Sequence, residues 1–150
     1  MPYFEEYEEG RIERFGAYHV RRDEVIDFAT KFDPQSFHLD DAAAATSPIV
    51  GRLAASGWHT CGMVMRMLTD AWTDKDGYFS LGGTGADELR WTKPVYPGDV
   101  LSVRAEVLSK SAPRSKPELG FIAFSITALN QHDEPVMTMK VTNIQKRRPV

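Results

Sequence analysis

One short segment carries an acid and a base close together in the sequence. Asp33 and His38 are five residues apart, and Pro34 interrupts the helical pattern between them, so we expect both on one loop. A carboxylate and an imidazole that point at one spot can hold a water molecule and move a proton at neutral pH. The spacing leaves a second interpretation open, in which Asp33 only ends a helix and His38 lies on the surface.

A second candidate is Gly57, which follows a loop and opens the longest apolar pattern of the chain. Because glycine has no side chain, a substrate can approach its backbone N–H, and the start of a helix favours negative charge there. That geometry suits the oxyanion that develops on a thioester carbonyl. The alternative is that Gly57 only lets its helix pack closely on a sheet.

The elements that must position these residues fall into two blocks. Apolar spacing predicts helices over Asp23–Phe32, Asp40–Thr46 and Ser56 to about Trp72, and Ser56 suits the N-cap of the last one. Strands are predicted over Arg11–Phe15, Tyr18–Val20, Ala86–Trp91, Val100–Lys110, Leu119–Asn130 and Pro135–Lys146. The helix from Ser56 is apolar nearly all round, which indicates a buried helix.

Long antiparallel strands around one apolar helix predict an α+β fold. We expect a single domain over residues 1–150, with a long curved antiparallel sheet wrapped around the central helix. A single sheet does not cover such a helix on every side. A second copy of the chain could cover the remaining apolar surface and the sheet edge, so we expect a homodimer or a multiple of dimers.

Composition excludes several classes of function. The 150 residues carry a net charge of −3 and one cysteine, which argues against nucleic acid as the main partner, against a disulfide framework and against a multi-cysteine zinc site. No apolar run is long enough to span a membrane. The first residues are acidic and lack the pattern of a signal peptide, so we expect a cytoplasmic protein.

Three segments, in this order along the chain, resemble the MaoC-like hydratase/dehydratase family, which includes the (R)-specific enoyl-CoA hydratases. They are Asp33-Pro34-Gln35-Ser36-Phe37-His38-Leu39-Asp40, then Gly51-Arg52-Leu53-Ala54-Ala55-Ser56-Gly57-Trp58-His59-Thr60, then Leu89-Arg90-Trp91-Thr92-Lys93-Pro94-Val95-Tyr96-Pro97-Gly98-Asp99. The resemblance runs from about Tyr18 to Lys146 and implies a hot-dog fold and a dimer. Asp33 and His38 occupy the acid and base positions of the family's Asp-x-Asn-Pro-x-His motif. The family's His-Gly-Met corresponds to Ser56-Gly57-Trp58, and its glycine supplies an oxyanion N–H.

The resemblance implies reversible addition of water to a 2-enoyl-CoA, giving a 3-hydroxyacyl-CoA. Asp33 and His38 would activate the water, the Gly57 N–H would hold the thioester oxygen, and Ser56 and Trp58 would contact the substrate. Trp58 is bulkier than the family's methionine, so we expect an acyl site of different shape. The substrate would be an acyl-CoA or acyl-carrier thioester. We expect no metal and no cofactor, because the thioester itself makes the β-carbon electrophilic.

Two other functions stay open at this point. One is a hot-dog acyl-CoA thioesterase, which would also use a carboxylate, a water and a helix N-terminus. The other is a non-catalytic acyl-binding protein that kept the fold. The spacing of Asp33 and His38 favours the hydratase over the first, and the presence of both residues argues against the second.

Several other residues could suggest sites of their own. His59 and Cys61 resemble part of a metal site, but the chain has a single cysteine, so we expect no zinc site. We expect His59 to be packed and Cys61 to be a small core residue. Met63, Met65 and Met67 are expected mostly in the core, although methionines also suit an adaptable acyl pocket.

Two further segments complete the predictions. Gly82–Gly85 has no following lysine and precedes a strand, so it is neither a phosphate-binding loop nor a dinucleotide-binding motif, and we expect a flexible loop near the mouth of a pocket. The basic run Lys146-Arg147-Arg148 is expected to be a solvated tail, with contact to the phosphates of CoA as the alternative.

Overall fold

The computed structural model describes residues 3–74, 77–78 and 80–149. Its main element is an antiparallel five-stranded sheet in the order β1-β5-β6-β7-β4. The strands of this sheet are β1 (Ile12–His19), β4 (Ser80–Trp91), β5 (Val100–Ser111), β6 (Leu119–Leu129) and β7 (Pro135–Lys146). The short strands β2 (Thr73–Asp74) and β3 (Gly77–Tyr78) pair with each other. The helices are η1 (Phe4–Glu6), α1 (Arg22–Phe32), η2 (Ser36–His38), α2 (Asp41–Ala45) and α3 (Gly57–Trp72).

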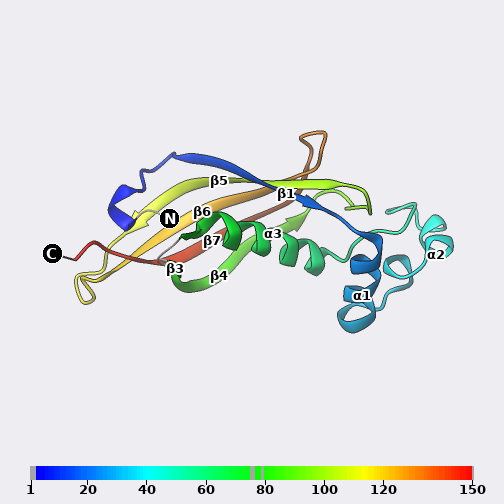
Figure 1. Cartoon of the computed structure of the whole chain (residues 1–150), viewed down its shortest axis with the longest axis horizontal. Coiled ribbons are helices and arrows are strands. Elements are labelled where there is room, and N and C mark those ends of the chain that lie inside the picture. The colour runs from blue at the N-terminus through cyan, green and yellow to red at the C-terminus, as the bar shows by residue number, and fades with distance from the viewer. Residues whose placement is uncertain (1–2, 75–76, 79, 150) are drawn as a thin grey trace.

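The sheet buries one face, as the alternating sequence predicts. In β5 and β6 every second side chain is buried, and the residues between them are more exposed. The buried set comprises Leu101, Val103, Ala105, Val107, Ile122, Phe124, Ile126 and Ala128. Helix α3 lies against this face, and the sheet curves around it (Figure 1). The prediction of an α+β domain with a sheet wrapped around a central helix is therefore confirmed.

Helix α3 is not buried on all sides, which corrects the prediction from its composition. Its buried side consists of His59, Thr60, Met63, Val64, Met67, Leu68 and Trp72. On the opposite side Trp58 and Met65 are 60% and 53% exposed in the single chain. One sheet covers only one side of a helix, so the apolar residues beyond that side stay at the surface.

The outermost strand on one side, β4, contains the glycines that the sequence predicted to be a loop. Gly82 and Gly83 pair with Ile144 and Asn143 of β7, so the loop prediction is wrong. The pairing is irregular, with a shift of register before Gly82 and another after Gly83. Gly82 has a φ of +136°, which glycine adopts easily, and the strand can therefore shift its register without leaving the sheet.

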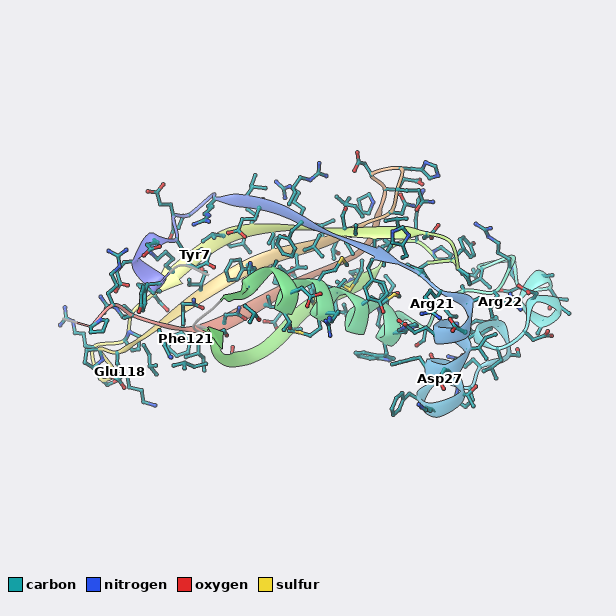
Figure 2. The ribbon with its side chains drawn as sticks, viewed as in Figure 1. Tyr7, Arg21, Arg22, Asp27, Glu118 and Phe121 are labelled. Carbon is teal, nitrogen blue, oxygen red and sulfur yellow. The ribbon has the colours of Figure 1, made fainter. Side chains whose placement is uncertain are left out.

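The helices α1, η2 and α2 gather at one end of the sheet, while η1 and the C-terminus lie at the other (Figure 1). Figure 2 labels Arg21, Arg22 and Asp27 at the first end and Tyr7, Glu118 and Phe121 at the second. In the part of the chain that the structure describes, no helix is long and apolar enough to cross a membrane.

The basic C-terminal run lies at the end of the sheet opposite to α1. Arg147 pairs with Glu5 at 2.9 Å, and Arg148 pairs with Glu6. These arginines therefore neutralise the first helical turn of their own chain. Their position supports the interpretation as a solvated tail rather than the alternative of a contact with CoA phosphates.

Candidate active site

Asp33 is the first residue after α1. Its backbone N–H donates to the carbonyl of Ala29 at 2.9 Å and closes the helix, and its φ of −152° takes the chain out of the helical path. Pro34 follows and lacks the N–H that a further helical turn would need. The carbonyl of Asp33 then accepts from the N–H of Gln35 at 2.8 Å, so the loop turns where the sequence predicts.

His38 ends the short η2 turn and is buried. Its Nδ1 lies 2.7 Å from the carbonyl oxygen of Ala54. Because a carbonyl oxygen only accepts, Nδ1 must carry a proton, and in the neutral ring Nε2 is left with a lone pair. Nε2 lies 3.4 Å from Oδ2 of Asp33. The structure thus brings together the two residues that the sequence singled out.

Ser56 also reaches this cluster. It is fully buried and occupies the N-cap position of α3, as predicted, but its hydroxyl does not cap the helix. Instead Oγ donates to Oδ2 of Asp33 at 2.7 Å, while Nε2 of Gln35 donates to Oδ1 at 2.7 Å. The Ser56 hydrogen bond is the main cause that lowers the pKa of Asp33, against the opposing effect of partial burial. The Gln35 hydrogen bond and the nearby His38 lower it further.

The cluster can therefore keep a carboxylate ionised beside an imidazole with an open Nε2. A water molecule placed between them can donate one hydrogen to Asp33 and the other to His38. The ring of His38 is held on its far side by Ala54, so a proton arriving at Nε2 gives an imidazolium that Asp33 stabilises. This arrangement suits general acid–base chemistry on a bound water.

Gly57 is the first residue of α3, and its amide is one of the first-turn N–H groups that have no partner within a helix. A Cβ at this position would overlap the indole ring of Trp91. Close packing of helix on sheet therefore requires a glycine here, which supports the structural interpretation of Gly57. Because it is a glycine, Gly57 also has no side chain that could cover its own amide.

A pocket of about 340 Å³ begins beside this amide. Its walls are largely apolar and come from the loop before α3, the start of α3 and the segment after β4. The residues that line it are Phe37, Ile49, Val50, Ala54, Ala55, Gly57, Thr60, Trp91, Thr92, Lys93, Pro94 and Val95. It borders the Asp33–His38 cluster through Ala54, whose carbonyl binds His38.

Trp58 lies outside this pocket. Its ring packs edge-on against Trp91, with the centroids 5.1 Å apart, and most of its surface is exposed. In the single chain the side chain thus faces away from the helix core. Within a single chain, Trp58 is therefore not placed to contact a substrate in this pocket.

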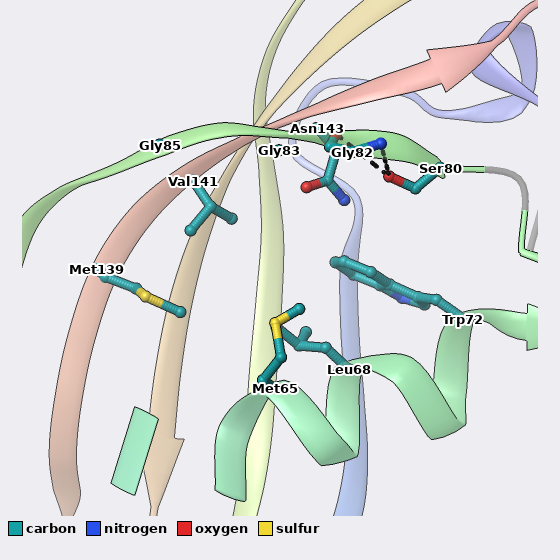
Figure 3. A pocket seen from close by; sticks show the side chains of 10 residues that line it. All are labelled: Met65, Leu68, Trp72, Ser80, Gly82, Gly83, Gly85, Met139, Val141 and Asn143. Atoms are coloured by element: carbon teal, nitrogen blue, oxygen red, sulfur yellow. Dashed lines mark hydrogen bonds between the residues drawn. The ribbon is translucent and has the colours of Figure 1, made fainter. Parts of the chain in front are cut away.

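A second apolar pocket, of about 380 Å³, lies toward the C-terminal half of α3 (Figure 3). Met65, Leu68 and Trp72 of α3 face Met139 and Val141 of β7 across it. Gly82, Gly83 and Gly85 of β4 form the remaining wall together with Ser80 and Asn143. Because the glycines have no side chains, they leave space that a residue with a side chain would fill. The predicted nearness of Gly82–Gly85 to a pocket therefore holds, although they form a strand.

A second histidine–carboxylate pair was not predicted. Nε2 of His59 lies 3.4 Å from Oε1 of Glu24, and the same oxygen accepts a hydrogen bond from the hydroxyl of Tyr18. The ring of His59 stacks on Phe28 at 4.8 Å. Burial lowers the pKa of His59, and burial together with the bond to Glu24 raises the pKa of Tyr18 to about 12. His59 is packed, as expected, but no local pattern could reveal a partner 35 residues away.

His59 and Cys61 do not share a metal site. The thiol of Cys61 lies 3.6 Å from the sulfur of Met137, on another side of α3 from Glu24, and burial raises its pKa. Among the residues that the structure describes, no three histidine, cysteine or acidic side chains converge as metal ligands.

Known proteins were compared with this chain by family model, by sequence and by solved structure. The family model described as "MaoC like domain" matches residues 6–120. A curated relative, the uncharacterised protein YdeM of Bacillus subtilis, is 29% identical over 145 residues, which is 95% of this chain and 98% of the relative.

Solved structures extend the likeness to the fold. A MaoC-like dehydratase from Rhodospirillum rubrum is 34% identical, with a TM-score of 0.88, and the match covers 100% of both chains. The (R)-hydratase PhaJ1 from Pseudomonas aeruginosa is 22% identical, with a TM-score of 0.73, over 97% of this chain and 86% of that one. The curved sheet around α3 is thus a hot-dog fold.

Proposed function

This chain belongs to the MaoC-like domain family, and from that premise we propose that it reversibly adds water to a 2-enoyl thioester, giving a 3-hydroxyacyl thioester. The observation that carries the proposal is the cluster of Asp33, His38 and Ser56, with Nδ1 of His38 fixed by Ala54. The likeness to a MaoC-like dehydratase and to an (R)-hydratase supports this reaction class.

The roles within the pair follow from its hydrogen bonds. Asp33 is a weak base because its pKa is lowered, so it orients the water and stays ionised. Nε2 of His38 takes a proton as the water oxygen bonds to the β-carbon and the C=C electrons move toward the thioester carbonyl. His38 then returns the proton to the α-carbon, so H and OH have been added across the double bond. The Gly57 N–H would hold the carbonyl oxygen while it carries negative charge.

The acyl chain needs an apolar site, and the pocket between α3, β4 and β7 offers one. It lies at the opposite half of α3 from Asp33. In a homodimer whose helices run antiparallel across a twofold axis, the C-terminal half of one α3 lies beside the N-terminal half of the other. We therefore assign the acyl chain to this pocket of one subunit and the water-activating pair to its partner.

The surface that such a homodimer would cover is apolar. Trp58 and Met65 of α3 and Leu81 and Trp91 of β4 are 45–60% exposed in the single chain. The outer edge of β4 adds unpaired backbone groups. We expect an interface of more than about 1,000 Å² in total, and sedimentation at micromolar concentration tests it. A monomer would contradict the dimer and the shared site.

Incubation with crotonyl-CoA tests the reaction. Hydration removes the enoyl absorbance and releases no thiol, and this is the expected result. Release of free thiol would instead indicate a thioesterase, and binding without either change would indicate an acyl-binding protein. The variant Asp33→Asn, which keeps the shape of the side chain, serves as the matched control and should hydrate far more slowly.

A further inference from the structure

A polar hollow adjoins the apolar pocket beside Gly57. This hollow has a volume of about 350 Å³ and shares Lys93 and Pro94 with the apolar pocket. Polar and charged side chains dominate its lining, which consists of Arg52, Lys93, Pro94, Tyr96, Asp99, Asn130, Gln131, His132 and Glu134. A long ligand whose thioester lies at Gly57 could therefore extend through the apolar pocket and end in the polar one.

Arg52 is the charged group of this hollow that keeps its donors available. Its guanidinium carbon lies 3.9 Å from the centre of the Tyr96 ring. Tyr96 is itself fixed, because its hydroxyl donates to the carbonyl of Val50. Among the described residues no carboxylate lies within ion-pair distance of Arg52. A guanidinium that stacks on a ring keeps the N–H groups on its edge free for a planar, forked contact.

The carboxylates of the hollow are already occupied by other groups. Glu134 pairs with Lys93. Asp99 is buried, and its two oxygens accept from the N–H of Tyr96 at 2.9 Å and from Nε2 of Gln131 at 3.0 Å. Arg52 is therefore the charged side chain of the hollow whose N–H donors remain open to an outside anion. Phosphate is the anion that such a fork matches best.

We propose that Arg52 binds the phosphate of the group that carries the acyl thioester. The inference rests on the proposed function and deepens it, because it names the charged end of the substrate. The pantetheine arm occupies the pocket lined by Val50, Pro94 and Val95, and the phosphate that follows it meets Arg52. Both coenzyme A and the prosthetic group of an acyl-carrier protein have this arm and this phosphate.

The test compares Arg52→Gln with wild type on two crotonyl thioesters. With crotonyl-CoA we expect KM to rise about tenfold or more and kcat to change little, since a hydrogen-bonded charge contact is lost. With the crotonyl thioester of N-acetylcysteamine, which has no phosphate, we expect the two proteins to behave alike. Arg52→Lys keeps a charge but not the fork and should fall between them. Arg114→Gln changes an exposed arginine in the β5–β6 loop and is the matched control for charge.

Further arms of the experiment identify the source of the phosphate. If the larger rise in KM occurs with crotonyl-CoA, the carrier is coenzyme A; if it occurs with crotonyl acyl-carrier protein, the carrier is that protein. An unchanged KM for both carriers overturns the proposal. An equal rise with the N-acetylcysteamine thioester also overturns it, because the substitution then disturbs the site as a whole.

Failure of the reaction and failure of the phosphate site can be told apart. If wild type hydrates none of the thioesters, the proposed function fails, and calorimetric titration with coenzyme A still tests Arg52. Weaker binding of coenzyme A to Arg52→Gln than to Arg114→Gln supports the site, and equal binding rejects it. Thermal unfolding of both variants shows whether loss of the Tyr96 contact has disturbed the fold.

Discussion

Two histidine–carboxylate pairs lie near the N-terminal end of α3, and they have the same separation. His38 Nε2 lies 3.4 Å from Asp33, and His59 Nε2 lies 3.4 Å from Glu24. Both rings are buried. Distance and burial therefore do not tell which pair is built to move a proton.

The second nitrogen of each ring does distinguish them. Nδ1 of His38 donates to the carbonyl of Ala54, so Nε2 of the neutral ring presents a lone pair. Nδ1 of His59 is buried without a hydrogen-bond partner, so the proton of its neutral ring is best placed on Nε2, where it donates to Glu24. The first ring is ready to accept a proton, whereas the second already uses its proton to hold a neighbour. A histidine–carboxylate pair is thus interpreted correctly only when both ring nitrogens are followed.

The largest expected effect is on catalysis. Asp33→Asn and His38→Ala should each lower kcat by about 10²–10⁴-fold, because each removes a positioned proton-transfer group. The matched change Glu24→Gln keeps shape and removes a charge in the other pair, and should leave kcat within about twofold. Steady-state hydration of crotonyl-CoA measures all three. An equal loss in Glu24→Gln would remove the distinction between the pairs.

The double variant of Asp33 and His38 tests whether they act on one water. If they do, it should be little slower than the slower single variant. Losses that multiply would mean that the two groups act in separate steps. Sedimentation and circular dichroism check that fold and oligomeric state are retained.

A smaller effect is expected from Ser56→Ala. The hydroxyl of Ser56 is the main cause of the lowered pKa of Asp33, so its loss should raise that pKa toward its ordinary value of 3.8. Loss of a hydrogen bond to a charged group should lower kcat/KM by about tenfold. The acidic limb of the pH profile of kcat/KM should move to higher pH. Thr60→Ala, which removes a buried hydroxyl one turn further along α3, is the control and should leave that limb in place.

Changes to the His59–Glu24 pair should affect the free energy of unfolding rather than the catalytic rate. Burial lowers the pKa of His59 below its ordinary value of 6.5, so below that pH the unfolded chain takes up a proton that the folded one does not. The free energy of unfolding therefore falls as pH drops below about 6.5, by at most about 1.4 kcal/mol per pH unit. His59→Leu should flatten this slope, as chemical denaturation at fixed protein concentration between pH 5 and 7 would show. Parallel curves for the two proteins would contradict it.

The lowered pKa of Asp33 acts in a lower range of pH. Its contribution to stability is present above the ordinary value of 3.8 and is lost as pH falls through the folded pKa. The two pairs therefore affect the free energy of unfolding in different ranges of pH. The slope near pH 6 should depend on His59 and not on Asp33.

The smallest effect is expected from Tyr18→Phe. It removes one donor to Glu24 and should cost about 1 kcal/mol, which corresponds to a fall in Tm of about 2–4 °C. Catalysis should not change. In an ultraviolet pH titration the wild type should show one tyrosine that ionises at about pH 12, and the variant should lack it. Tyr96→Phe, in the loop between β4 and β5, removes a hydroxyl that is not bound to Glu24 and is a control that should keep this late transition.

Much of this arrangement could be predicted from local sequence. The helix before Asp33, the break at Pro34 and the start of α3 at Ser56–Gly57 all follow from residue preferences and apolar spacing, which act within a few residues. The alternating strands follow from the period of two. The predicted elements therefore brought Asp33 and His38 to one loop, and the family resemblance gave the fold.

What the sequence could not predict depends on contacts between distant residues. Ser56 was expected to cap α3, but a carboxylate 23 residues earlier competes for the same hydroxyl. Glu24 receives no role from the local sequence, because its partner on α3 is set by packing. Gly82 and Gly83 were expected in a loop, since pairing with β7 is invisible in a local pattern.

The contact of Gly57 with Trp91 affects how large sets of variants of this chain should be interpreted. Any side chain at position 57 would overlap the indole of Trp91, so we expect substitutions there to lower the amount of folded protein as well as its turnover. A screen that scores activity alone would place Gly57 beside Asp33 and His38. A parallel score of cellular abundance separates them, because Asp33→Asn keeps its abundance and Gly57→Ala loses it. Glycine at this position would thus serve two ends, the packing of helix on sheet and the proposed contact of its amide with the thioester oxygen.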